Sequence, residues 1–320
     1  MADTSSPDFD PVPLAAYDGA VPPAPDWFTK AIATPFETHF VEVDGARVHY
    51  QVWGEANKPG LLFVHGNGAH AHWWDFIAPY FTEQYQVAAM TFSGMGDSDH
   101  REHYSMDLFA AEEMAVLNAT GMFERAAPPV ICAHSFGGFV NLLVSAEHGA
   151  RLGGTITVDT RINPPGGPQM GPPPRPIGTR VYPSLEAALA RFRLAPPQPC
   201  ENHFILDYIA RHSLKEATGD QGEPGWAWKF DPGIWRHYEG RDNPGQLMAA
   251  CQCRTAVIRG EESILVGNDV RDYMLECLGP VPFISIPHAQ HHIMLDQPLA
   301  FVAALRTLLA GWRSADARAA

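Results

Sequence analysis

The chain has 320 residues, of which 46% are hydrophobic, and a formal net charge of −14 at pH 7. This length fits one large α/β domain with an insertion, and the apolar content is enough for a sizeable core. The negative charge argues against a nucleic-acid partner and against binding to an anionic membrane.

Cysteine usage and the ends of the chain give a first expectation about location. The five cysteines are an odd number, which fits a reducing cytosol better than a disulfide framework. Cys251 and Cys253 have no second Cys/His pair nearby, which argues against a zinc site. No apolar run reaches transmembrane length, and the acidic, Pro-rich start does not resemble a secretory signal. We expect a cytoplasmic protein.

Strand and helix patterns alternate along most of the chain. Two alternating runs, 38–43 and 47–53, flank Asp44-Gly45 and predict a β-hairpin. Continuous apolar runs predict buried parallel strands at 60–64, 85–92, 130–133, 155–158, 254–258 and 282–286. Helical segments are predicted between them at 73–83, 106–120, 136–149, 268–278 and 297–311. The alternation predicts an α/β fold with a doubly wound, mostly parallel sheet.

Composition divides the chain into three parts. Residues 1–36 are rich in proline and predict an N-terminal arm laid over the body. Residues 161–245 interrupt the alternation with many prolines and glycines, two short amphipathic segments (184–193 and 201–214) and several aromatic residues. We therefore expect a core of residues 37–160 and 246–320, with 161–245 inserted as a cap or lid.

The strand predicted at 130–133 leads into a serine with small neighbours. Ala133 and Gly137 lie two residues on either side of Ser135, and a helix is predicted to follow. A sharp strand-to-helix turn of this kind exposes a serine hydroxyl and demands small residues at those two positions. A serine at this place also suits a helix N-cap, so the local pattern alone leaves both roles open. A nucleophilic serine needs a histidine base and a carboxylate to orient it.

Further motifs occur in a fixed order around this turn, and with them the chain resembles a capped α/β-hydrolase from about residue 37 to 312. The motifs are His65-Gly66-Asn67-Gly68, Ser93-Gly94-Met95-Gly96-Asp97-Ser98, the serine turn, and His291 five residues before Asp296-Gln297-Pro298. The resemblance implies that Ser135 is a catalytic nucleophile. It also implies that His291 is the base, with His292 as the alternative. His288, His291 and His292 could also hold a metal, but no acidic ligands stand beside them, and we expect neither a metal nor a cofactor.

The acid departs from the usual pattern of the family. The resemblance places it after the strand at 254–258, at the position of Ser263, so the expected aspartate is missing. Some family members use an acid after the preceding strand instead, and Asp159 ends that strand here. We expect Asp159 to be the acid, with Glu262 and then Glu261 as alternatives; Asp159 could also be an ordinary polar residue at a strand end.

The resemblance also implies an oxyanion hole formed by the backbone N–H groups of Asn67 and Phe136. Aromatic residues of the insertion suggest an apolar substrate pocket, although they could equally form the cap's own small core. The candidate substrate-binding residues are Trp226, Trp228, Trp235 and, after the oxyanion turn, Trp73.

These residues favour a serine hydrolase that cleaves a small, largely apolar ester or lactone through an acyl-enzyme. The same site could hydrolyse a carbon–carbon bond in a ring-cleavage product, or an amide. The alternative outside the enzymes is a non-catalytic receptor for a small molecule, because the chain lacks the acid at the usual position. Dehalogenases that share the His-Gly-Asn motif use an aspartate nucleophile, so Ser135 argues against that chemistry and against epoxide hydrolysis. We expect a monomer or homodimer whose partner is its small-molecule substrate.

Overall fold

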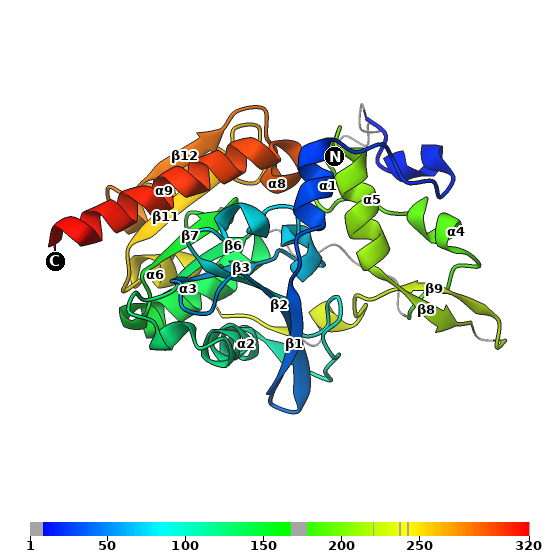
Figure 1. Cartoon of the computed structure of the whole chain (residues 1–320), viewed down its shortest axis with the longest axis horizontal. Helices are drawn as coiled ribbons and strands as arrows, with labels where there is room; N and C mark the ends of the chain where they lie inside the picture. Colours follow the sequence, from blue (N-terminus) through cyan, green and yellow to red (C-terminus); the bar gives the residue numbers. More distant parts are fainter. Residues whose placement is uncertain (1–8, 168–177, 220, 237, 242, 320) are drawn as a thin grey trace.

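A computed structural model describes residues 9–167, 178–219, 221–236, 238–241 and 243–319. An eight-stranded sheet runs through the core, with strand order β1-β2-β4-β3-β6-β7-β11-β12. Strands β1 and β2 form an antiparallel hairpin, β2 pairs antiparallel with β4, and the remaining neighbours are parallel. The predicted doubly wound, mostly parallel α/β fold is therefore confirmed (Figure 1).

The strands follow the apolar runs of the sequence. The sheet consists of β1 (Glu37–Val43), β2 (Ala46–Trp53), β3 (Gly60–Val64), β4 (Gln86–Met90), β6 (Val130–His134), β7 (Gly154–Val158), β11 (Thr255–Gly260) and β12 (Phe283–Ile286). Every residue of β3, β4, β6, β7 and β11 is buried, as expected for strands covered on both faces. Edge strand β1 is exposed or half-buried throughout. The Asp44-Gly45 turn has positive φ at both residues, which the tight hairpin requires.

Helices flank this sheet on both sides. They are α2 (Met106–Ala119), α3 (Phe136–His148), α6 (Pro244–Ala249), α7 (Asn268–Leu278), α8 (Ile293–Asp296) and α9 (Pro298–Ala319). Figure 1 shows α9 running along one side of the sheet while α2 and α3 lie on the other. Helix α6 packs on α3 and α7.

One predicted helix is wrong. Residues 73–83 form two short 3₁₀ turns, η2 (Ala71–Trp74) and η3 (Ala78–Phe81), instead of a continuous α-helix. Pro79 lacks an N–H, and its ring clashes with the preceding turn, so a helix cannot run through it.

The segment between β7 and β11 has its own secondary structure. It contains α4 (Leu185–Leu189), α5 (His203–His212) and an antiparallel hairpin of β8 (Leu214–Thr218) and β9 (Pro224–Trp228). The hairpin was not predicted. Shorter elements are η6 (Ile234–Arg236) and β10 (Tyr238–Glu239), which pairs with β5 (Tyr104–Ser105) of the core.

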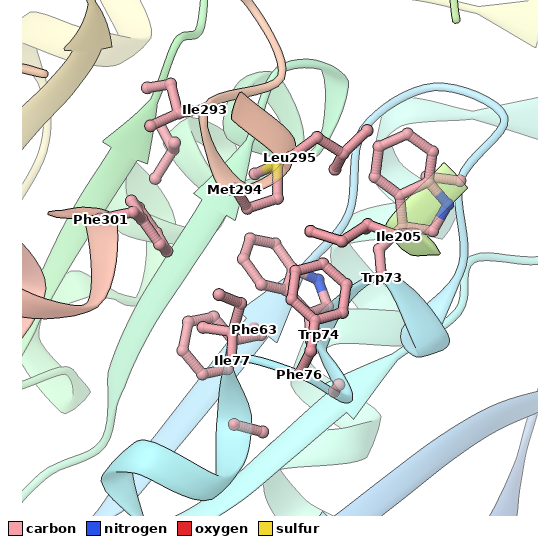
Figure 2. Packing of buried hydrophobic residues seen from close by; sticks show 14 of the residues in the cluster. Phe63, Trp73, Trp74, Phe76, Ile77, Ile205, Ile293, Met294, Leu295 and Phe301 are labelled. Carbon is pink, nitrogen blue, oxygen red and sulfur yellow. The ribbon is translucent and has the colours of Figure 1, made fainter. Parts of the chain in front are cut away.

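The N-terminal segment also packs on the body. It forms η1 (Pro13–Tyr17) and helix α1 (Asp26–Ile32), and Leu14 and Phe28 are buried. Both join a large apolar cluster shared by the core and the segment between β7 and β11. Figure 2 shows part of it, with Ile205 of α5 beside Trp73 and with Leu295 of α8 nearby.

Candidate active site

Ser135 lies at the turn between β6 and α3, in a backbone conformation that residues other than glycine rarely adopt. Its backbone has φ 52° and ψ −116°. Strain of this kind persists only where the surroundings enforce it. Here the Ser135 N–H donates to Val158 O at 2.8 Å, and the Ser135 carbonyl accepts from Thr160 Oγ1 at 3.1 Å. A Cβ on Gly137 would lie 2.5 Å from the carbonyl oxygen of His65, so only glycine fits there. The turn therefore holds a half-buried serine at the carboxyl edge of the sheet.

Asp159 and His291 meet at the same edge. Asp159 directly follows β7, and His291 lies in the loop after β12. The Asp159 Oδ2 atom accepts a hydrogen bond from His291 Nδ1 at 2.7 Å, and both side chains are almost completely buried. This contact fixes the tautomer of His291 with its other ring nitrogen, Nε2, free to accept a proton.

The end of β11 lies between these two residues and supports the contact. The Gly260 N–H donates to Asp159 Oδ1 at 3.2 Å, and the Ser263 hydroxyl donates to Asp159 Oδ2 at 2.6 Å. The loop that carries His291 crosses directly over Gly260, where a Cβ would lie 2.1 Å from the carbonyl oxygen of Gln290. Ser263, at the position where the family pattern places the acid, is thus a hydrogen-bond donor to Asp159.

The alternative acids lie elsewhere. Glu262 faces His288, with 3.5 Å between Oε1 and Nδ1, and both side chains are well exposed. Glu261 is exposed as well. The structure brings Asp159, and neither glutamate, to His291.

Two further histidines hold the surrounding loops. His134 Nε2 donates to the carbonyl of His291 at 3.0 Å, and the two rings face each other with 4.7 Å between centroids. His65 Nδ1 donates to the Gly66 carbonyl at 2.6 Å, and its Nε2 accepts from the Phe92 N–H at 3.0 Å. Burial lowers the pKa of His65 to about 4, and burial followed by the proximity of His291 keeps the pKa of His134 well below its usual value. Both rings are therefore neutral near pH 7 and act through hydrogen bonds.

The peptide groups on either side of His291 are also bound. The Gln290 N–H donates to Asp296 Oδ2 at 2.7 Å, and the His292 N–H donates to Gln198 Oε1 at 3.0 Å. Gln198 lies in the segment between β7 and β11, 94 residues before His292, and is buried. No local pattern in the sequence marks it, so this contact was not predicted.

The predicted oxyanion donors adjoin residues close to Ser135: Phe136 follows it directly, and Asn67 follows Gly66, on which a Cβ would lie 3.0 Å from Ser135 Cβ. Phe136 is the first residue of α3, and Asn67 lies in the turn after β3. Within the described residues, neither backbone N–H has a hydrogen-bond acceptor. The pair is thus free to bind a developing negative charge near the serine.

The four predicted substrate-binding tryptophans fall into two pairs. The Trp235 ring packs edge-on against Phe136 at 5.1 Å, and Trp73 lies 5.4 Å from the ring of His292. Trp228 instead packs on rings within the inserted segment, those of Tyr182 and Phe192. Trp226, in the same strand, pairs with Tyr182 through its backbone. Trp226 and Trp228 thus have the contacts expected of a small cap core, whereas Trp235 and Trp73 border residues of the site.

Three histidines of the site have the spacing of a possible metal group. One ring nitrogen each of His134, His291 and His292 lies within 4.8 Å of the others. A bound ion must lie in the plane of each ring that ligates it. His134 Nε2 already donates to the His291 carbonyl and His291 Nδ1 to Asp159, so only the other nitrogen of each of these rings could reach an ion.

With this geometry in view, comparison with known proteins gives the family. Residues 61–305, more than half of the chain, match the alpha/beta hydrolase family, and the chain belongs to it. Epoxide hydrolase 4 of Mus musculus is 30% identical over 108 residues, which make up 33% of this chain and 29% of that protein. The match therefore spans less than a third of the curated relative.

Solved structures agree on the fold. The thioesterase domain from the curacin biosynthetic pathway has a TM-score of 0.68 and 21% identity, and the alignment covers 85% of this chain and 99% of that domain. A novel esterase from Mycobacterium tuberculosis has a TM-score of 0.64 and 20% identity, with 95% and 99% covered. At these identities the likeness shows the shared fold alone. In the described part of the chain, no helix is long and apolar enough to cross a bilayer.

Proposed function

We propose that the protein is a serine hydrolase that cleaves a small, largely apolar ester or lactone through an acyl-enzyme. The observation that carries the proposal is the buried Asp159–His291 contact of 2.7 Å beside the strained turn of Ser135. Asp159 and His291 meet there, and Ser135 follows β6, the strand beside β7, so the three residues come in the order and at the strand ends that a Ser-His-Asp site requires.

The proposed chemistry follows from the roles of these groups. The Ser135 hydroxyl attacks the carbonyl carbon while His291 Nε2 accepts its proton, and Asp159 stabilises the imidazolium that forms. The N–H groups of Phe136 and Asn67 bind the oxygen as it becomes negative. His291 then returns the proton to the leaving alcohol. A water, activated by the same histidine, releases the acid from Ser135.

The aromatic residues next to Ser135 and His292 support an apolar substrate. Trp235 and Phe136 supply aromatic surface next to the nucleophile, and Trp73 lies beside His292. The name of the mouse relative raises epoxide hydrolysis as a competing activity. The aspartate nucleophile of that chemistry would have to stand where this chain has Ser135, so we favour acyl transfer.

Covalent labelling tests the proposal. A fluorophosphonate should modify the wild-type protein at Ser135, and Ser135→Ala should be neither labelled nor able to hydrolyse nitrophenyl esters. Assays of a dienoic ring-cleavage product alongside the esters separate carbon–carbon from ester hydrolysis. A folded wild-type protein that binds small molecules tightly but resists labelling would favour a receptor and contradict the proposal.

A further inference from the structure

The loop that carries His291 is bound by a side chain from the segment between β7 and β11. Gln198 is buried, and its amide makes three hydrogen bonds to this loop and to helix α8. Its Nε2 group donates to both oxygens of Asp296 at 2.9 Å, and its Oε1 atom accepts from the His292 N–H at 3.0 Å. A carboxylate needs donors and an N–H needs an acceptor, so the amide fits in this orientation only.

With these bonds, the backbone is hydrogen-bonded at His291 and at the residues on both sides of it. On one side the Gln290 N–H binds Asp296, on the other the His292 N–H binds Gln198, and between them the His291 carbonyl accepts from His134. Two of the three supports depend on Gln198, because it holds both the His292 N–H and the carboxylate of Asp296. The His291 ring itself is bound by Asp159 alone among these groups.

A second side chain joins the same two parts of the chain. Asn202 is the N-cap residue of α5, yet its side chain does not cap that helix. Its Nδ2 group donates instead to the carbonyls of Leu295 and Asp296, at 2.7 and 3.3 Å. The last carbonyls of a helix need such donors, so Asn202 stabilises the end of α8. The polar contacts continue into apolar ones, since Ile205 of α5 lies in one cluster with Leu295 (Figure 2).

We propose that Gln198 is a positioning residue for His291, through which the segment between β7 and β11 holds the base in its reactive place. The inference rests on the proposed function, in which His291 accepts the proton of Ser135. A base displaced by about 1 Å can lose on the order of 10²-fold in rate, so a contact at the neighbouring peptide suffices to alter catalysis.

Two variants remove different parts of the contact. Gln198→Met keeps the length of the side chain and removes all three hydrogen bonds. Gln198→Glu keeps an acceptor for the His292 N–H, but it removes the donor to Asp296 and places a second carboxylate beside it. Gln252→Met is the matched control, because the Gln252 amide is exposed and donates to the Ala146 carbonyl near the amino end of β11, away from the site.

We expect Gln198→Met to lower kcat for a nitrophenyl ester, and the rate of fluorophosphonate labelling of Ser135, by about 10- to 100-fold with little change in KM. Gln252→Met should match the wild type. In Gln198→Glu the two adjacent carboxylates share a proton at low pH and repel each other once both are ionised, so the labelling rate relative to the wild type should fall as the pH rises. A merely structural contact would lower stability without that pH-dependent loss of rate. A wild-type labelling rate in Gln198→Met overturns the inference, and if that variant does not fold, a Gln198→Glu labelling rate in constant ratio to the wild type at every pH overturns it.

A second measurement tests the positioning role even if the proposed function is wrong. If the wild type is not labelled, the position of His291 is read by proton NMR from the Nδ1–H resonance in its hydrogen bond to Asp159, assigned by its loss in Asp159→Asn. We expect this resonance to broaden or shift in Gln198→Met and to persist in Gln252→Met. An unchanged resonance in Gln198→Met would contradict the positioning role whether or not the protein is an esterase.

Discussion

At the scale of single residues, Asp159 shows how a buried carboxylate is stabilised. No part of it is exposed, and its oxygens accept from the Gly260 N–H, the Ser263 hydroxyl and His291 Nδ1. Three donors offset much of the cost of removing the charge from water. Because the donors come from the end of β11, from the loop after it and from the loop after β12, the carboxylate also joins the ends of neighbouring strands.

This arrangement predicts the effect of removing the charge. Asp159→Asn presents an amide to His291, which favours the tautomer that cannot accept a proton from Ser135, so kcat should fall by roughly 10⁴. Glu262→Gln should change kcat less than about threefold, since an exposed pair with His288 contributes little. Steady-state ester hydrolysis measures both. An active Asp159→Asn protein together with an inactive Glu262→Gln protein would show that the acid has been misassigned.

At the scale of elements, the short helix α8 is held mainly by its surroundings. It has four residues, too few to be stable alone, and Ile293, Met294 and Leu295 are all buried. Its last residue, Asp296, accepts from the Gln290 N–H and from Gln198. Burial nevertheless raises the pKa of Asp296 to about 6, so the desolvation of its carboxylate outweighs these donors.

The raised pKa of Asp296 makes stability depend on pH. An unfolded aspartate titrates near pH 3.9, so between about pH 4 and 6 the native protein binds the proton more tightly than the unfolded chain does. The stability gained from this tighter proton binding is fully present below pH 4 and is lost as the pH rises through 6. The unfolding free energy of the wild type should therefore fall by about 2 kcal/mol relative to Asp296→Asn between pH 4 and 7. Urea unfolding at several pH values measures the difference, and parallel curves for the two proteins would contradict it.

Local patterns predicted elements better than they predicted contacts between them. The Asp44-Gly45 hairpin and the helix at 268–278 form where expected, because turn chemistry and amphipathic spacing act over a few residues. The helix predicted through Pro79 does not form, because a proline supplies no N–H to a continuing helix. The β8–β9 hairpin was missed because its strands carry a weak alternation.

In the candidate site, too, residues within local motifs could be predicted, but contacts between distant residues could not. Ser135 and His291 could be proposed because each lies in a short motif. Asp159 could be proposed only through its place after a strand, and neither its bond to Ser263 nor the contact of Gln198 with His292 could be foreseen. Those bonds depend on which strands are neighbours in the sheet and on how the inserted segment docks, and no local spacing encodes either.

At the scale of the whole molecule, polar and apolar contacts join the inserted segment to the core. Tyr208 of α5 donates to Asp75 Oδ2 at 2.6 Å, and Lys229 contacts Asp97 Oδ1 at 2.6 Å. Burial raises the pKa of Tyr208 and the nearby Asp75 raises it further, so the phenol remains a donor throughout the ordinary pH range. These contacts dock the segment on the core, and Gln198 of the same segment contacts the loop of His291.

Helix α1, near the N-terminus, packs where helix α5 meets the core. The Phe28 ring is 3% exposed and contacts Phe76 of the core together with Phe204 and Tyr208 of α5. Phe28→Ala should leave a cavity between all three parts and lower the unfolding free energy by about 3–5 kcal/mol. Val21→Ala, in the same arm but 69% exposed, should stay within about 0.5 kcal/mol of the wild type. Chemical denaturation of the two variants tests this, and equal stabilities would mean that the arm is an appendage with no part in holding the inserted segment against the sheet.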